Sequence, residues 1–345
     1  MNWPELRQKL EPAKDWIIKN QSDDGSISWD EKGKCDPWDH CECLIALAIY
    51  EEWDAWHKGV NWFLENINQH GLIPPEFQNQ RATQMHFESH HAPYISLALM
   101  QASLIDKKQI DYLSKKSNFK EKIDLIFNEL NNFRDEDGYY FWAKDKKGYS
   151  DNSLITATMS ILLSIKANDI SKDINFDTLK WSKKFNRDGQ DRSRFSMDFY
   201  YPFLAGIKKD KSEFKKILKS FYVEGLGVKC VKEEPWVTFA ESSECVLAAL
   251  VNGNENLAEE IFKNLLQFQN SDGIFPTGYQ YDLKIFWPEE KSTWTNAAVI
   301  IAGHALCTYK ENKIGIGSNV FINYVIFTYL KQTYRSKMAK EYLTA

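Results

Sequence analysis

The chain has 345 residues and a mildly negative formal charge of −5, from 43 Lys and Arg against 48 Asp and Glu. It contains no basic block and no arginine–aromatic interleaving, so its charge pattern argues against a nucleic-acid-binding protein. No apolar stretch is long enough for a signal peptide or a membrane span. We therefore expect a cytoplasmic protein without an integral membrane segment. Its six cysteines fit small core residues in a reducing compartment.

A three-part pattern recurs six times along the chain: a helix-like segment, a polar turn with glycine, and a second helix-like segment. The turn glycines are Gly25, Gly71, Gly138, Gly189, Gly225 and Gly273. The segments before the turns combine spaced apolar residues with many lysines, which is typical of a helix with one buried face. They span 4–20, 55–68, 119–133, 176–185, 212–222 and 256–269. A repeat of about 50 residues predicts helical hairpins that stack on one another.

The segments after the turns begin with polar and aromatic residues and continue with Ala, Leu, Ile, Val and Ser. They begin at Asp36, His86, Tyr149, Arg194, Pro235 and Ser292. This composition is typical of a helix surrounded by other helices. We predict an all-α fold, an (α/α)6 toroid of six hairpins in which these segments form parallel inner helices. The toroid would span 1–317 as one domain, and 318–345 would form a C-terminal helix and tail that pack on the ring.

The turn glycines carry a prediction of their own. Gly25, Gly138, Gly189 and Gly273 follow outer helices at positions where a left-handed residue commonly ends a helix. Glycine adopts that conformation without a steric penalty. We therefore expect a positive φ at these four residues.

Two of the turns carry a resemblance to a known family. The segments 21–29 (QSDDGSISW) and 269–273 (QNSDG) resemble the glutamine-and-tryptophan repeat of squalene cyclases. The chain to about Leu306 resembles the terpenoid cyclase and protein prenyltransferase α/α-toroid group. DPWDHCE, RFSMDFYYP, PWVTFAE and STWTNAA look like segments of bacterial proteins loosely labelled prenyltransferases. The resemblance implies the toroid and isoprenoid chemistry. The chain departs from it by lacking both an Asp-x-Asp-Asp motif and an Asp, Cys and His zinc set.

Carboxylates gather at the beginnings of the predicted inner helices. Parallel helices would place six N-termini at one mouth of the ring, where helix dipoles favour negative charge. Asp36, Thr238 and Ser292 fit N-caps. Asp39, Glu42, Asp198, Glu241 and Glu244 lie within the first turns, where a carboxylate in a packed ring needs a partner or a raised pKa. We select Asp39 or Asp198 as a Brønsted acid and Glu241 as its hydrogen-bond partner or base.

Other residues at the same mouth are candidates for substrate binding. They are Trp38, His40, Glu42, His90, Tyr200, Tyr201, Trp236, Trp294 and Arg194. An aromatic wall stabilises carbocations and also stacks on sugar rings, and the sequence does not separate these uses. Arg192 and Arg194 fit either an anion contact or ordinary surface charges. His86 and His90 would share one helix face, but no third ligand is apparent in the sequence, so we predict neither a metal nor a cofactor.

Three functions remain open at this level. The first is an isoprenoid-type cyclase or prenyl-transfer enzyme, a lyase, isomerase or transferase with an aromatic cavity and an aspartic acid as proton donor. The alternative is a carbohydrate-active α/α-barrel enzyme that binds a saccharide and uses paired carboxylates such as Asp39 and Glu241. The third is a non-catalytic ring that binds a small molecule or a partner. A deep apolar pocket favours the first and an open polar groove favours the second.

Overall fold

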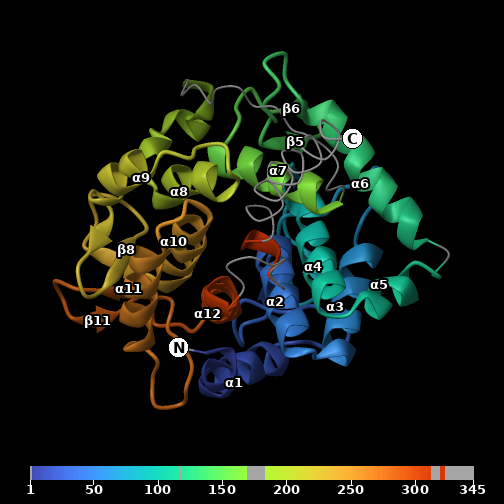
Figure 1. Ribbon diagram of the computed structural model, residues 1–345. Helices are drawn as coiled ribbons and strands as arrows, with labels where there is room; N and C mark the ends of the chain where they lie inside the picture. Colours follow the sequence, from blue (N-terminus) through green and yellow to red (C-terminus); the bar gives the residue numbers. More distant parts are fainter. Residues whose placement is uncertain (1, 117, 169–182, 312–318, 323–345) are drawn as a thin grey trace, which may run out of the picture.

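The computed structural model describes residues 2–116, 118–168, 183–311 and 319–322. Its described part is mainly helical, and the predicted (α/α)6 toroid is confirmed (Figure 1). The inner helices are α2 (Pro37–Tyr50), α4 (His91–Ile105), α7 (Ile155–Asn168), α8 (Ser196–Leu204), α10 (Phe239–Val251) and α12 (Thr293–Glu311). Each packs on the next in this order, and α12 packs back on α2. The inner helices therefore form a closed ring.

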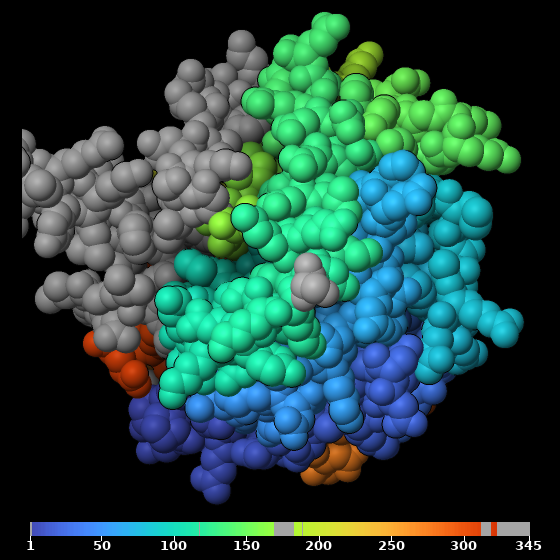
Figure 2. Space-filling view, turned by 90° about the vertical axis from the view of Figure 1, so that its right-hand side faces the viewer, coloured from blue at the N-terminus to red at the C-terminus, as the bar shows by residue number. Residues whose placement is uncertain are grey.

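An outer layer surrounds this ring. Its helices in the described part are α1 (Trp3–Lys19), α3 (Trp53–Glu65), α5 (Lys107–Leu113), α6 (Phe119–Phe133), α9 (Lys211–Leu218) and α11 (Glu255–Leu266). Figure 2 shows the side of the molecule that the outer segments from α3 to α6 cover. The short helix α5 is not predicted by the sequence pattern. The outer helix expected at 176–185 lies mostly outside the described residues, and Lys183–Phe185 form a 3-10 turn, η1.

The first and last hairpins close the ring by direct contacts. α1 packs against both α12 and α2. The indole nitrogen of Trp16 donates a hydrogen bond of 2.8 Å to the carbonyl of Lys291. The Thr293 hydroxyl, at the start of α12, donates a bond of 2.8 Å to the carbonyl of Ser28. Segments about 270 residues apart in the sequence thus form one wall of the toroid.

The turn glycines have the predicted conformation. The φ angles of Gly25, Gly138, Gly189 and Gly273 are 99°, 88°, 73° and 76°. A Cβ atom at Gly25 would lie 2.2 Å from the carbonyl oxygen of Lys58 in α3, and one at Gly273 would lie 2.6 Å from Pro12 in α1. At these two turns, glycine therefore also lets the turn pack directly on the neighbouring outer helix.

Short antiparallel strands, which the sequence pattern does not predict, precede several inner helices. Three sheets are described, ordered β1-β2-β3, β4-β5-β6 and β11-β10-β9-β8-β7. The strands are β1 (Lys34–Cys35), β2 (Phe77–Gln78), β3 (Arg81–Ala82), β4 (Phe87–Glu88), β5 (Ala143–Asp145), β6 (Gly148–Tyr149), β7 (Tyr222–Val223), β8 (Gly227–Lys229), β9 (Trp236–Thr238), β10 (Gly278–Gln280) and β11 (Ile285–Phe286). β1 leads directly into α2 and β9 into α10, so these sheets lie at the N-terminal ends of inner helices, where the site is expected.

Two inner helices, α4 and α7, begin later than expected. The later start of α4 corrects the prediction made for His86 and His90. α4 begins at His91 because residues 87–88 pair with β5, as Glu88 does with Ala143. His86 therefore precedes a strand, and the prediction that His86 and His90 share a helix face is wrong. α7 similarly begins at Ile155, after β6.

The remaining expectations concern the cysteines, the membrane and the C-terminus. All six cysteines are free thiols. Within the described ranges, no helix combines the length and the apolar character that crossing a membrane requires. Of the segment 318–345, only 319–322 are described, so the predicted C-terminal helix lies largely outside the described residues. The Asn319 side chain donates a hydrogen bond of 3.2 Å to the carbonyl of Ile301 in α12.

Candidate active site

Trp38, in the first turn of α2, is the centre of an aromatic cluster at the mouth of the ring. Its ring stacks on Tyr94 of α4, with centroids 4.5 Å apart and planes at 22°. The His90 ring meets it edge-on at 4.8 Å, and the Tyr201 ring of α8 lies at 5.9 Å. The structure thus brings together three of the predicted binding residues, Trp38, His90 and Tyr201, and adds Tyr94.

Two buried glutamates are held by tyrosine hydroxyl groups beside this cluster. The Tyr94 hydroxyl donates a hydrogen bond of 2.6 Å to Oε1 of Glu42. Glu244 of α10 accepts hydrogen bonds from Tyr200 and, at 2.7 Å, from Tyr201. Burial raises the pKa of Glu42 to about 7, although the bond from Tyr94 opposes the rise. Burial, followed by the charge of Glu42, raises the pKa of Glu244 well above its ordinary value.

Asp39 differs from these glutamates because its carboxyl group has no hydrogen-bond or ion-pair partner among the described residues. Its exposed fraction is 9%. Burial raises its pKa well above the ordinary value, and the charges of Asp36, Glu42 and Glu244 add to the rise. Burial and neighbouring negative charges both favour the protonated form of a carboxyl group, which is the form that a general acid needs. Asp39 therefore has the properties expected of a general acid.

Glu241, the predicted base, lies in the first turn of α10 and is 6% exposed. Burial raises its pKa, while the neighbouring side chains of Thr238 and Cys230 oppose the rise. The charge of Glu241 contributes to the raised pKa of Glu244, and the charge of Glu244 contributes to that of Asp39. Asp39 of α2 and Glu244 of α10 therefore lie within electrostatic range of each other, and so do Glu244 and Glu241.

Asp198 of α8 is the most firmly held carboxylate of the predicted set. It accepts hydrogen bonds from the backbone N–H (3.3 Å) and hydroxyl (2.5 Å) of Thr156, and Nε of Arg192 lies 3.4 Å away. Burial raises its pKa, and Arg192 and Thr156 oppose the rise. These partners favour a fixed, charged carboxylate over a proton donor. Arg194, in contrast, forms an ion pair of 3.1 Å with Glu233 at the surface.

His40 has a structural role and does not fit the predicted binding role. Its Nδ1 accepts a hydrogen bond of 3.1 Å from the backbone N–H of Ile27, and its Nε2 lies 3.1 Å from the carbonyl of Gly59 in α3. Burial lowers its pKa to about 4. Both ring nitrogens therefore bind backbone groups in the interface between an inner and an outer helix.

Trp236 and Trp294 lie at the beginnings of α10 and α12, and each packs on a neighbouring loop. Trp236 donates a hydrogen bond of 2.7 Å to the carbonyl of Trp287 and meets the Trp287 ring edge-on. The Trp294 ring lies 5.8 Å from that of Trp29. These two tryptophans thus shape the loops around the mouth.

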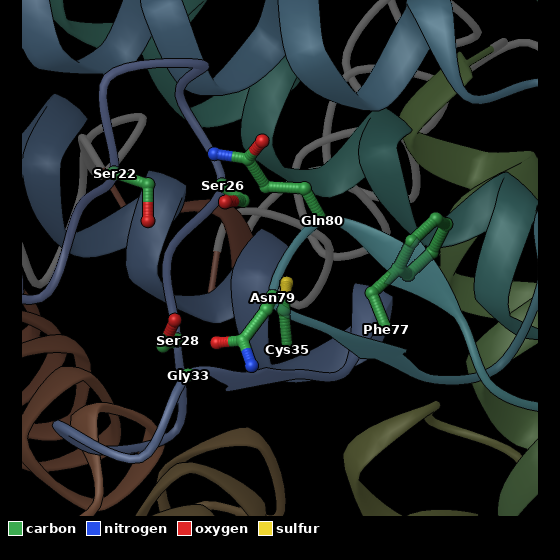
Figure 3. A pocket seen from close by; sticks show the side chains of 8 residues that line it. All are labelled: Ser22, Ser26, Ser28, Gly33, Cys35, Phe77, Asn79 and Gln80. Atoms are coloured by element: carbon green, nitrogen blue, oxygen red, sulfur yellow. The ribbon is translucent and has the colours of Figure 1, made fainter.

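A cavity of about 310 Å³ lies between the loop that precedes α2 and the β2–β3 turn (Figure 3). It is lined by Ser22, Ser26, Ser28, Gly33, Cys35, Phe77, Asn79 and Gln80. Figure 3 shows the amide side chains of the β2–β3 turn beside the serines of the loop that precedes α2. The charges of Asp36 and Asp39 help to raise the pKa of the Cys35 thiol, so this wall of the cavity lies near both carboxylates.

The sequence did not single out Tyr94 or Thr156, and it gave Arg192 no particular partner. Tyr94 interrupts an otherwise small-residue and aliphatic stretch of α4, a signal that could have identified it. Thr156 and Arg192 act through contacts with Asp198, which is about 40 residues from Thr156 in the sequence. Pairings of this kind have no local sequence pattern.

Comparison with known proteins gives the chain a sugar-processing relative. No family model matches it. It is 28% identical over 304 residues to MMP endo-(1,4)-3-O-methyl-alpha-D-mannosidase of Mycolicibacterium hassiacum, an alignment that covers 84% of each protein. Similar solved structures include an α-amylase from Clostridium perfringens (TM-score 0.59, 14% identity, covering 85% of this chain and 96% of that one). A D-mannose isomerase matches with a TM-score of 0.64 and 12% identity, over 88% of this chain and 97% of that one. These structures show the fold.

The comparisons correct the resemblance to terpenoid cyclases and protein prenyltransferases, which is wrong, and with it the isoprenoid function. The glutamine of the repeat has a structural explanation. Nε2 of Gln21 donates hydrogen bonds to the carbonyls of Gly25 (3.1 Å) and Ala55 (2.9 Å). Gln269 makes the equivalent pair with Gly273 and Lys9. The motif ties a turn to the neighbouring outer helix and carries no information about the reaction. The findings support an enzyme whose relative acts on a saccharide.

Proposed function

We propose that this protein is a glycoside hydrolase that cleaves an oligosaccharide or polysaccharide at the mouth of the toroid. The observation that carries the proposal is Asp39, a buried and unpartnered carboxyl group with a raised pKa beside a second set of carboxylates on α10. Glycoside hydrolysis commonly needs one carboxylic acid to protonate the leaving oxygen and one carboxylate on the other side of the bond. We assign these two roles to Asp39 and to a carboxylate of α10.

Asp39 is the general acid in this proposal and Glu241 the carboxylate that activates water or attacks the sugar. Asp39 donates its proton to the glycosidic oxygen, so the leaving sugar departs as a neutral alcohol. Glu241 acts from α10, which α12 separates from α2 in the ring. Asp198, held by Thr156 and Arg192, orients the substrate through its hydroxyl groups.

The surroundings suit a saccharide. A sugar ring can stack on an aromatic face such as that of Trp38, which has a polar neighbour in His90. The cavity beside Cys35 has serine hydroxyls and amide groups that can exchange hydrogen bonds with sugar hydroxyls, and its volume lies at the lower end of the range of ligand pockets. Following the name of the relative, we propose α-(1→4)-linked mannose, including 3-O-methylated units, as the substrate class.

The test is a comparison of purified protein on defined oligosaccharides. The panel contains α-(1→4)-linked mannose oligomers with and without 3-O-methyl groups, maltooligosaccharides, and a prenyl diphosphate as negative control. We expect new reducing ends and internal fragments by mass spectrometry from the mannose oligomers. Absence of product from every saccharide, or equal product formation by Asp39→Asn, contradicts the proposal.

One observation favours a second candidate, a sugar isomerase or epimerase. His90 and His91 lie with ring centroids 4.5 Å apart, and the His90 ring also meets Trp38 edge-on, so two imidazoles, the side chains that most often transfer protons in enzymes, lie beside the aromatic cluster. Such an enzyme would convert free mannose without increasing the number of reducing ends. Incubation with free mannose, followed by chromatography of the monosaccharides, distinguishes the two candidates.

A further inference from the structure

Glu88, His90 and His91 form a compact polar cluster where β4 leads into α4. Nε2 of His90 lies 3.6 Å from Oε2 of Glu88, and Nε2 of His91 lies 3.7 Å from the same oxygen. One ligand atom from each of the three residues lies within 4.8 Å of the other two. Two imidazoles and one carboxylate therefore converge on one point.

The two distances from Oε2 of Glu88 to the imidazole nitrogens are too long for hydrogen bonds. They are close to the distance between two atoms that ligate the same metal ion. An N–H···O bond spans 2.7–3.2 Å, whereas these contacts measure 3.6 and 3.7 Å. Two ligand atoms bound tetrahedrally at about 2.0–2.1 Å from zinc lie about 3.4 Å apart. The two contacts to Oε2 of Glu88 therefore exceed this separation by only a few tenths of an ångström.

The orientation of Glu88 supports this arrangement. Its other oxygen, Oε1, lies 3.4 Å from Nε2 of His86. This contact leaves Oε2 directed toward His90 and His91. A neighbouring group that holds a ligating carboxylate in place is a regular feature of metal sites.

The two histidines are buried without hydrogen-bond partners. His90 is 7% exposed and His91 4%. In the described part of the chain, Nδ1 of both rings lacks a hydrogen-bond partner, and neither Nε2 has one within hydrogen-bond distance. Within the described residues, the two Nε2 atoms, which lie nearest to Glu88, are therefore available to ligate a metal ion.

The charges around the cluster are mixed. Oδ1 of Asp36 lies 3.9 Å from Nε2 of His91 and adds negative charge to that of Glu88. Arg187 opposes them, since its charge helps to lower the pKa values of Glu88 and His90.

We propose that Glu88, His90 and His91 bind a divalent transition-metal ion, with Zn²⁺ as the expected occupant. Imidazole nitrogen and carboxylate oxygen suit zinc, and three protein ligands leave a fourth position for water or a substrate hydroxyl. The proposal revises the expectation from the sequence that no metal binds. It does not depend on the proposed hydrolase activity.

Direct binding tests the site. Protein freed of metal by a chelator is titrated with Zn²⁺ in a calorimeter, as wild type and as Glu88→Gln and His90→Gln. His57→Gln is the matched control, because His57 lies on the outer helix α3 and bonds to Gln109. We expect one equivalent of Zn²⁺ in wild type and control, and at least about 100-fold weaker binding in the two cluster variants, since loss of even an outer partner costs about 10–100-fold.

A second readout keeps the test decisive if a variant folds poorly. Addition of Co²⁺ to the wild type should give the absorption of a four- or five-coordinate nitrogen and oxygen set, and Zn²⁺ should raise the melting temperature of wild type and His57→Gln. The proposal is overturned if wild-type protein shows no saturable Zn²⁺ binding and no Co²⁺ spectrum. It is equally overturned if folded Glu88→Gln and His90→Gln bind Zn²⁺ as tightly as the wild type.

Discussion

The Tyr94 hydroxyl donates a 2.6 Å hydrogen bond to Glu42, and this buried bond joins the inner helices α4 and α2. Tyr94 has no exposed surface and Glu42 is 1% exposed, so water does not compete for either group. The same tyrosine ring stacks on Trp38. One residue thus positions both an aromatic surface and a carboxylate of the site.

Replacement of Tyr94 by Phe should remove the bond and keep the ring. The buried Glu42 carboxyl group would lose its donor, and we expect the free energy of unfolding to fall by about 1–3 kcal/mol, the cost of leaving a buried polar group without its partner. Urea denaturation measures the change. Tyr112→Phe is the control, because Tyr112 is 54% exposed and should show almost no effect. Equal effects of the two substitutions would contradict the role of the bond.

Glu42 should make stability fall as pH rises. Its pKa is about 7 in the folded protein against an ordinary value of 4.5. Between these pH values the folded state holds a proton that the unfolded state has released, so the free energy of unfolding decreases with pH, by about 3 kcal/mol in total for this group. Glu42→Gln should lose that decrease, measured by urea denaturation from pH 4.5 to 7. Glu233→Gln, at an exposed ion pair, should keep the wild-type profile. Parallel profiles in wild type and Glu42→Gln would contradict the raised pKa.

Replacement of either proposed catalytic carboxylate should lower activity without unfolding the protein. We expect Asp39→Asn and Glu241→Gln each to lower kcat on the mannose oligomers by about 10²–10⁴-fold, the usual contribution of a general acid or base. Their circular dichroism spectra should match the wild type, because Asp39 has no described partner to lose. Glu233→Gln again serves as the control and should keep full activity. If both site variants retain wild-type kcat, Asp39 and Glu241 are not the catalytic pair.

Gly25 should tolerate alanine less well than Gly189 does. Both residues have positive φ, which costs a non-glycine residue about 1–2 kcal/mol. A Cβ at Gly25 would also lie 2.2 Å from the Lys58 carbonyl, whereas nothing lies within 4 Å of one at Gly189. We therefore expect a larger fall in melting temperature for Gly25→Ala, measured by calorimetry. Equal falls would mean that the turn does not need close contact with α3.

The ring could be predicted from the sequence because its signals are local. Helical periodicity and a turn glycine recur within each hairpin, and no long-range information is needed to recognise them. The strands escaped prediction because two- or three-residue segments have no measurable period. Their pairing, such as that of Lys34 with Gln78, joins loops far apart in the sequence.

The sequence located the first turns of the inner helices but not the directions in which their side chains point. The beginnings of the inner helices were located well enough to select Trp38 and Asp39. His40, the next residue, is rotated by about 100° around the helix and therefore faces α3. Its partners, the backbone groups of Ile27 and Gly59, become neighbours only when the hairpin folds. The predicted isoprenoid reaction was wrong because the Gln21 motif reflects the packing of a turn on an outer helix and not the chemistry of the site.

Because α12 packs on α1 and α2, the ring has no terminal repeat, whereas an open helical array has one at each end. In an open array the last unit has one neighbour only and frays first, so unfolding proceeds inward from the ends. Here each inner helix packs on another inner helix on both sides. This includes α2 and α12, the first and last inner helices in the chain. Loss of the packing between any two neighbouring inner helices would turn the ring into an array with two free ends. The remaining hairpins could then unfold from both ends.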